Sequence, residues 1–180
     1  VRIARGRRLP EIAVDRGTAL ALSYDQQRLW LLDQIDGGSA HYNMCGAFQI
    51  QGQLQMAALR QALDCIVARH ESLRTVFAAD SSGVPLQIIQ APGPCPFTEL
   101  DISALPASAR QDALRNIMAQ EAGRPFDLSC DLMLRVVLVR LGQDDHAMLA
   151  SMHHIASDGW SISIFINELC ALYQAFANGV

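Results

Sequence analysis

Apolar residues recur at helical spacing in several stretches of the chain. The clearest case is residues 55–70, where apolar positions fall three or four residues apart, as on one face of an amphipathic α-helix. The members of this stripe are Met56, Leu59, Leu63, Ile66 and Val67. Another helix is predicted to begin near Ser23, a favourable N-cap residue, and to end at Gly37 and Gly38. Further helices are predicted over residues 107–122 and 160–177.

Shorter apolar runs bounded by turn residues predict β-strands. They cover residues 43–51, 73–77, 85–90, 97–102, 132–141 and 147–155. The strands at 73–77 and 85–90 flank a Ser-Ser-Gly turn and are predicted to form a hairpin. The strands at 132–141 and 147–155 have apolar residues at successive positions, which indicates a hairpin buried on both faces. The predicted fold class is therefore mixed α/β (α+β), with helices packed on a sheet.

Residues 1–18 differ from the rest of the chain. They are rich in Arg and Gly, contain Pro10 and show no sustained period, so they are predicted to form a linker. The remaining residues, 19–180, are predicted to form one compact lobe. A chain of 180 residues that is 51% hydrophobic can bury a core of its own.

Composition and charge exclude several classes of protein. The net charge of −4 argues against a nucleic-acid partner, which usually requires a basic face. No apolar run approaches the ~18 residues that a transmembrane helix needs, so no membrane partner is expected. The five cysteines are widely spaced, without a CxxC pair, which favours a reduced, cytoplasmic location. Charged residues make up 18% of the chain against ~25% in a typical domain, which fits either a surface covered by a partner or ordinary variation.

The residues with the clearest chemical signal lie between a buried strand and the last helix. The run Ser151–Ser161 contains His153, His154, Asp158 and Gly159. Adjacent strand residues point to opposite faces, so the two histidines are not expected to meet one substrate atom or to chelate one metal ion. An acid at position 158 can cap the helix or pair with an arginine, and the glycine permits an unusual backbone angle or a close approach by substrate. The alternative is a packed histidine pair followed by an ordinary Asp-Gly turn.

Three motifs in this sequence resemble those of one enzyme family. Residues 153–159 read HHIASDG and match the HHxxxDG signature of condensation domains, and residues 69–77 read RHESLRTVF and match RHExLRTxF. Residues 22–32 read LSYDQQRLWLL and are similar to the family's opening motif S-x-A-Q-x-R-L-W, with a small departure at Asp25 and Gln26. The order and spacing of the motifs, over residues 22–161, resemble the condensation domains of nonribosomal peptide synthetases, which take part in antibiotic biosynthesis.

The resemblance implies an architecture and a set of partners. Residues 19–180 would form the N-terminal, chloramphenicol-acetyltransferase-like lobe of a two-lobe domain, without its C-terminal lobe. Because the family's active site lies between the lobes, we expect the isolated chain to be inactive. The implied partners are the donor and acceptor carrier proteins, the missing C-terminal lobe and neighbouring synthetase domains. No cofactor is expected to bind directly, since the phosphopantetheine arms of the carriers bring the substrates.

The resemblance also implies a reaction and roles for individual residues. The family joins a carrier-bound acyl or peptidyl thioester to the amine of a carrier-bound aminoacyl group. His154 would meet the attacking amine, either as general base or as a polar anchor that orients it and stabilises the tetrahedral species. His153 would be a packing residue, Gly159 would support the loop, and Trp30 is expected in the core. Asp158 is predicted to pair with an arginine, and the candidates in order of preference are Arg74, Arg69 and Arg28.

Other readings of the same motifs stay open at the level of sequence. Epimerisation domains share HHxxxDG and would invert an α-carbon instead of forming an amide. A non-catalytic module that recruits a partner protein could share the fold. A stand-alone acyltransferase would use a free coenzyme A thioester in place of one carrier.

Overall fold

The computed structural model describes residues 20–179, so the predicted linker at residues 1–18 lies outside the described part of the chain. The helices are α1 (Tyr24–Asp36), α2 (Met56–Arg69), α3 (Ala107–Gly123) and α4 (Gly159–Ala177), with a 3₁₀ turn, η1 (Glu71–Arg74). The strands are β1 (Leu20–Ala21), β2 (Asn43–Gln51), β3 (Thr75–Ala79), β4 (Pro85–Ile89), β5 (Phe97–Asp101), β6 (Leu134–Arg140) and β7 (Asp145–His153). The prediction of a mixed α/β fold is confirmed.

The predicted strands and helices lie within two residues of observed ones, and the shift of one strand has a local cause. The strand predicted at 73–77 begins instead at Thr75, because residues 71–74 close the turn η1. In that turn the Leu73 amide donates to the His70 carbonyl (3.0 Å) and the Thr75 hydroxyl donates to the Glu71 carbonyl (2.8 Å). Local side-chain hydrogen bonds of this kind compete with a strand ladder, which alternating hydrophobicity alone does not reveal.

The strands form two sheets. The larger has the order β2-β7-β6-β5, in which β5 and β6 run parallel and the other neighbours run antiparallel. The smaller has the order β1-β4-β3 and contains the predicted hairpin of β3 and β4. Strand β7 lies between β2 and β6, and its register places His153 opposite Asn43 of β2.

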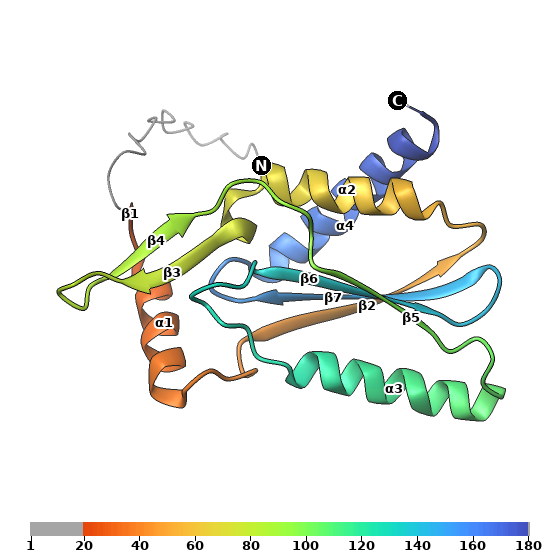
Figure 1. Ribbon diagram of the computed structural model, residues 1–180, viewed down its shortest axis with the longest axis horizontal. Coiled ribbons are helices and arrows are strands. Elements are labelled where there is room, and N and C mark those ends of the chain that lie inside the picture. Colours follow the sequence, from red (N-terminus) through yellow and green to blue (C-terminus); the bar gives the residue numbers. More distant parts are fainter. Residues whose placement is uncertain (1–19, 180) are drawn as a thin grey trace, which may run out of the picture.

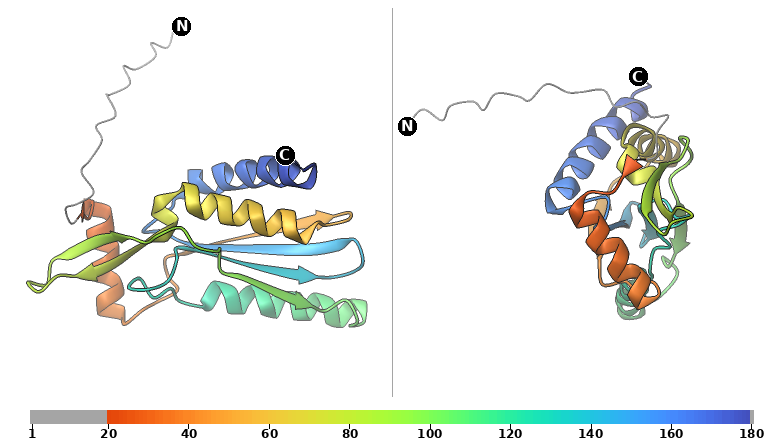
Figure 2. Two further views of the ribbon diagram at one scale, coloured as in Figure 1. Left: turned by 45° about the horizontal axis from the view of Figure 1, so that its top comes forward. Right: turned by 90° about the vertical axis from the view of Figure 1, so that its left-hand side faces the viewer.

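Helices cover both faces of the larger sheet (Figures 1 and 2). On one face, α2 and α4 pack over apolar side chains of β6 and β7, around a core that includes Leu63, Ile66, Leu134 and Met152. On the other face, α3 covers a smaller cluster around Val139 and Leu149. Almost every residue of β6 and β7 is buried, so the predicted buried hairpin is confirmed. None of the helices within residues 20–179 is long and apolar enough to cross a membrane.

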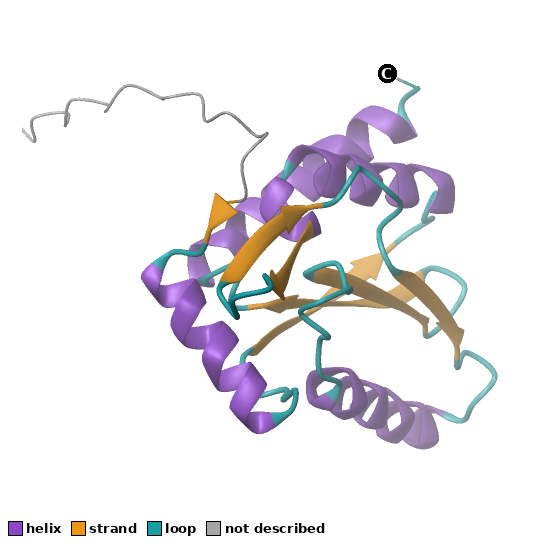
Figure 3. Cartoon of the chain, turned by 60° about the vertical axis from the view of Figure 1, so that its left-hand side comes forward, coloured by secondary structure: helices purple, strands orange, loops and turns teal. Residues whose placement is uncertain are grey.

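Helix α1 and the smaller sheet flank one end of the larger sheet (Figure 3). The helix begins as predicted at Ser23, whose hydroxyl accepts the Gln26 amide in a capping box, and it ends at Gly37 in the left-handed conformation (φ 68°). A separate apolar cluster joins α1 to the smaller sheet and to the loop after β7 through Leu29, Phe77 and Ile155, with Trp30 packed against it as predicted. This cluster fixes the position of α1 beside the histidine pair.

Candidate active site

The two histidines of the signature occupy opposite sides of the backbone at the end of β7, as predicted. His153 is the last residue of the strand and is 1% exposed, whereas His154 begins the following loop and is exposed to solvent. The His154 amide donates to the Tyr42 carbonyl (2.9 Å), which ties the loop to the segment before β2. A buried strand therefore presents one imidazole to the core and the next to the surface.

His153 is held as a neutral imidazole. The rings of Tyr42 and Phe126 make T-shaped contacts with its ring at centroid distances of 6.4 Å and 5.9 Å, and the Ile155 amide donates to Nδ1 (3.1 Å). Because Nδ1 accepts this hydrogen bond, the neutral ring carries its proton on Nε2. Burial, and then the neighbouring His154, lower the pKa of His153 to about 4. These contacts support the predicted packing role of His153.

Stability is expected to fall as the pH drops from 6.5 to about 4, because the unfolded chain takes up a proton that folded His153 refuses. Above pH 6.5 neither state binds this proton and the contribution is fully present, whereas below about pH 4 both states bind it and the loss stops. The expected loss over this window is about 3 kcal/mol. Urea titrations at a series of pH values measure it. The matched control is His153→Asn, whose Oδ1 keeps an acceptor for Ile155; an equal pH slope in that variant would exclude His153 as the cause.

Among residues 20–179, His154 uses one ring nitrogen for a hydrogen bond and leaves the other without a partner. Its Nδ1 lies 2.7 Å from the Ser157 carbonyl oxygen, which can only accept a hydrogen bond. Nδ1 therefore carries a proton, and in the neutral ring Nε2 holds the lone pair. The Ser157 hydroxyl in turn donates to the His153 carbonyl (3.0 Å), so the loop between the strand and the helix is braced from within.

His154 faces an open hollow of about 590 Å³, which we call the His154 hollow. Its walls are the start of α1, Gln87 of β4 and the loop from His154 to Asp158. Gln26 connects these walls: its side-chain amide lies 3.4 Å from both the Gln87 side-chain oxygen and the Ile155 carbonyl. The opening motif at residues 22–32 and the histidine motif thus meet at one site, although the sequence separates them widely.

Asp158 caps helix α4. Its Oδ1 accepts hydrogen bonds from the Ser161 amide (2.9 Å) and hydroxyl (2.7 Å), while the Ser161 hydroxyl accepts the Asp158 amide (3.1 Å). Hydrogen bonds from the Ser161 hydroxyl and amide, in that order, hold the pKa of Asp158 below its ordinary value. Of the two roles considered for this acid, the structure shows the cap.

The predicted ion pair between Asp158 and an arginine does not form among residues 20–179, so this prediction is wrong. Arg74, the first choice, donates to the Gln90 carbonyl and to Glu71 Oε1 (3.3 Å), and Arg69 pairs with Glu168 of α4 (2.6 Å). Arg28 lines the His154 hollow, but the bonds of the Asp158 carboxylate go to Ser161. Arg74 buries its guanidinium between the turn η1 and the end of β4. Its predicted supporting role at the site would therefore be structural.

Gly159 is the first residue of α4, and the proposed need for an unusual backbone angle there is not met. The glycines with positive φ in the described chain are at other positions, and a Cβ built at residue 159 meets no atom within 4 Å. The open space above Gly159 leaves room for a substrate, which stays a prediction. Its neighbour Trp160 is 83% exposed beside this space.

Removing the cap is expected to destabilise the loop that carries His154. Asp158→Ala should lower the melting temperature by about 2–4 °C, because the amide of Ser161 loses its acceptor, whereas Asp158→Asn keeps a good N-cap and should stay near wild type. Thermal unfolding followed by circular dichroism measures both variants. Identical melting of the alanine variant and the wild type would contradict the capping role.

Several contacts at this site were not predicted from the sequence. Glu168 of α4 binds both Arg69 and His70, which fastens the end of α2 to α4. Phe126 and Tyr42 enclose His153, and Ser157 sets the tautomer of His154. The sequence pattern gave no signal for these contacts, whereas the cap of α4 had one, since Asp158 and Ser161 have the spacing of a capping box.

Comparisons with known proteins agree on the family. The family model described as "Condensation domain" matches residues 17–180. A linear gramicidin synthase from Brevibacillus parabrevis is 42% identical over 171 residues, which is 95% of this chain and 2% of that protein. Phosphinothricin tripeptide synthetase PhsC of Streptomyces viridochromogenes is 43% identical over 158 residues, 88% of this chain and 14% of that protein.

Solved structures show the same fold. The starter condensation domain of rhizomide synthetase RzmA superposes with a TM-score of 0.82 at 24% identity, covering 91% of this chain and 39% of that one. The first condensation domain of the CDA synthetase superposes with a TM-score of 0.80 at 26% identity, covering 90% of this chain and 41% of that one. The chain thus spans well under half of each of these structures and a small part of the gramicidin synthase. By its family match and its relatives, the chain belongs to the condensation domain family.

Proposed function

We propose that this chain is the N-terminal lobe of a condensation domain that joins a carrier-bound acyl or peptidyl thioester to the amine of a carrier-bound aminoacyl group. The observation that carries the proposal is the free Nε2 of His154, held by the Ser157 carbonyl at the edge of an open hollow. The names of the relatives, synthetases of gramicidin and of a phosphinothricin tripeptide, support a peptide product.

The geometry of His154 suits the proton transfers of this reaction. The amine nitrogen attacks the thioester carbonyl carbon, the C–S bond of the tetrahedral species breaks, and the thiolate leaves on its phosphopantetheine arm. Nε2 can accept a hydrogen bond from the amine and so direct its lone pair at the carbonyl. It can also take the proton released on attack and return it to the leaving thiolate, so that no proton is gained or lost overall.

The Ser157 carbonyl can hold the His154 ring in both its neutral and its protonated form. It accepts the Nδ1 proton whether the ring is neutral or charged, and its partial negative charge stabilises an imidazolium when one forms. An α-amino group titrates near ~7.7, so a useful fraction of the acceptor is already the free base at neutral pH. We therefore assign His154 chiefly to orientation of the amine and stabilisation of the charged tetrahedral species.

The proposed partners are the donor and acceptor carrier proteins, a C-terminal lobe that closes the His154 hollow, and neighbouring synthetase domains. The large apolar side chains that α1 and α4 expose near this hollow, Tyr24 and Trp160 among them, support a covering partner. A reduced cytoplasmic setting is proposed as well, since all five cysteines carry free thiols. The phosphopantetheine arms would reach His154 from the carriers, and the chain itself would hold no cofactor.

The test is carrier-to-carrier transfer by a protein that contains this chain with the rest of its domain. A loaded donor carrier and a loaded acceptor carrier are mixed with it, and both are followed by intact mass spectrometry. We expect the acyl mass to move to the acceptor carrier. Inversion of a carrier-bound α-carbon without transfer leaves the mass unchanged, so it is read by chiral chromatography of the released amino acids, and it would replace the proposal with epimerisation. Equal transfer from a free coenzyme A thioester would replace it with a stand-alone acyltransferase.

A further inference from the structure

A second hollow, of about 480 Å³, lies between α3 and the larger sheet. We call it the α3 hollow; its lining comes from α3, β2, β7 and Leu141, and it shares no residue with the His154 hollow. Its residues on β7 end at Leu149, which at roughly 3.3 Å per strand residue lies about 16 Å from His154. The α3 hollow is therefore a separate site from the one that carries the condensation chemistry.

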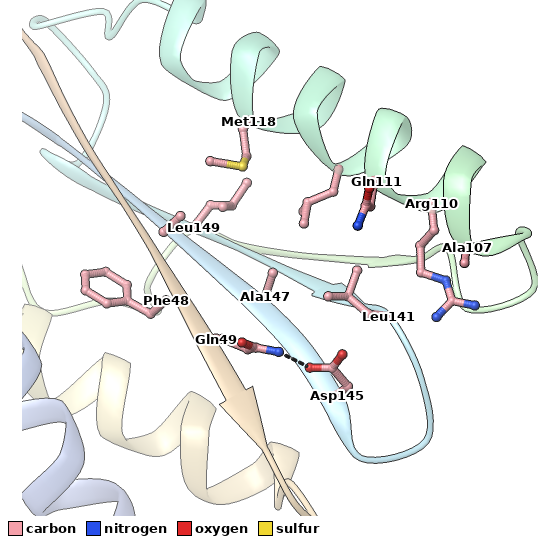
Figure 4. A pocket seen from close by; sticks show the side chains of 12 residues that line it. Phe48, Gln49, Ala107, Arg110, Gln111, Met118, Leu141, Asp145, Ala147 and Leu149 are labelled. Carbon is pink, nitrogen blue, oxygen red and sulfur yellow. Dashed lines mark hydrogen bonds between the residues drawn. The ribbon is translucent and has the colours of Figure 1, made fainter.

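One part of the α3 hollow is apolar. Met118 and Leu149 face each other across it, and Ala147 and Leu141 form its floor further along (Figure 4). Helix α3 packs loosely here: none of its residues is buried, and Met118 remains 39% exposed. The helix thus leaves apolar surface of the sheet uncovered, which a ligand with an apolar group could remove from water.

The other part carries two opposite charges that do not neutralise each other. Arg110 of α3 donates from Nη2 to the Ser103 and Leu105 carbonyls, and within residues 20–179 its Nη1 has no hydrogen-bond partner. Asp145 of β7 accepts the Gln49 side-chain amide at Oδ1 (2.9 Å), which leaves Oδ2 available. No ion pair within 4.0 Å joins Arg110 to Asp145 in the described chain, so a gap between the two charges stays open.

We propose that the α3 hollow binds a free amino acid with a large apolar side chain. The carboxylate pairs with Arg110, the ammonium group pairs with Asp145, and the side chain extends over Ala147 toward Met118 and Leu149. A fatty acid would leave Asp145 unpaired, and an alkyl amine would leave Arg110 unpaired, so a zwitterion is the small ligand whose charges match both ends of the gap. The inference does not depend on the proposed condensation activity.

Isothermal titration calorimetry on the purified protein tests the proposal with leucine and phenylalanine as ligands. We expect saturable binding of both. N-acetyl-leucine, which lacks the ammonium charge, and leucinamide, which lacks the carboxylate, should each bind at least about tenfold more weakly, because each leaves one protein charge without its partner. Serine, which lacks the apolar group, should also bind at least about tenfold more weakly.

Variants of lining residues locate the site. Arg110→Gln and Asp145→Asn should each weaken leucine binding about tenfold or more, and the asparagine keeps the acceptor that Gln49 uses. Ala47 is an exposed lining residue of β2, so Ala47→Trp should fill the hollow and abolish binding without loss of fold, checked by circular dichroism. The matched control is Arg115→Gln, because Arg115 lies on the same helix, 72% exposed and outside the hollow, and this change should leave affinity within twofold.

Two results would overturn the proposal. One is the absence of heat from leucine and phenylalanine at concentrations that saturate ordinary amino-acid sites. The other is binding that N-acetyl-leucine matches, or that Ala47→Trp leaves intact, since either would show that the ligand lies elsewhere.

Discussion

Replacement of His154 by alanine is expected to lower the rate of carrier-to-carrier transfer by about 100- to 10,000-fold while the protein stays folded. The variant removes Nε2, the nitrogen that the Ser157 hydrogen bond leaves free for the amine. Because His154 is exposed, its loss creates no cavity, and the melting temperature should change little. Single-turnover transfer between loaded carriers, followed by mass spectrometry, measures the effect. Near-wild-type turnover would remove His154 from the mechanism in both of its proposed roles.

A second substitution at the same position separates the two roles. The side-chain amide oxygen of His154→Gln can reach the region of Nε2, where it accepts a hydrogen bond from the amine but cannot take a proton. If His154 chiefly orients the amine, the glutamine variant should retain clearly more activity than the alanine variant, and its rate should rise with pH as the amine loses its proton near ~7.7. Equal, low activity of the two variants would show that proton transfer to His154 is the main effect.

The sequence predicted best those features that depend on local periodicity. The apolar stripe of residues 55–70 became α2, and the successive apolar residues around β6 and β7 became the buried hairpin. The opposite exposure of His153 and His154 followed from the alternation of side chains along a strand. Once these elements form, the histidine motif must lie between the end of a buried strand and the start of a helix.

The predictions that failed, and the contacts that were missed, depend on distances between elements. Arg69 was the second choice of partner for Asp158, but the packing of α4 on α2 brings Glu168 to it instead. The Asp158 carboxylate was satisfied by Ser161, its own neighbour in the helix, which made a distant arginine unnecessary. Likewise, Phe126 reaches His153 only through the long connection from α3 to β6, for which the sequence pattern gives no geometry.

The connection that carries Phe126 depends on a buried guanidinium, that of Arg135 on β6. It donates to Glu121 Oε2 (3.2 Å) and to the carbonyls of Pro125 (3.1 Å), Glu121 (3.2 Å) and Arg124, and it stacks 4.0 Å from the Phe126 ring centroid. Asn43 of β2 donates to the Arg124 carbonyl as well (2.8 Å). Arg135, together with Asn43, therefore satisfies the end of α3, and its guanidinium packs on Phe126, which contacts His153.

Arg135→Met is expected to lower the free energy of unfolding by about 3–5 kcal/mol, because a partly buried carboxylate and the carbonyls of Glu121, Arg124 and Pro125 each lose a charged donor. Adding Glu121→Gln to this variant should recover part of the loss, since the carboxylate that lost its buried partner is then replaced by a neutral amide. Arg115→Met, on the exposed face of α3 and 72% exposed, is the matched control and should stay within about 0.5 kcal/mol of wild type. Urea unfolding measures all three. If Arg135→Met costs no more than the Arg115 control, the guanidinium is not what holds Phe126 against His153, and apolar packing must position the histidine pair.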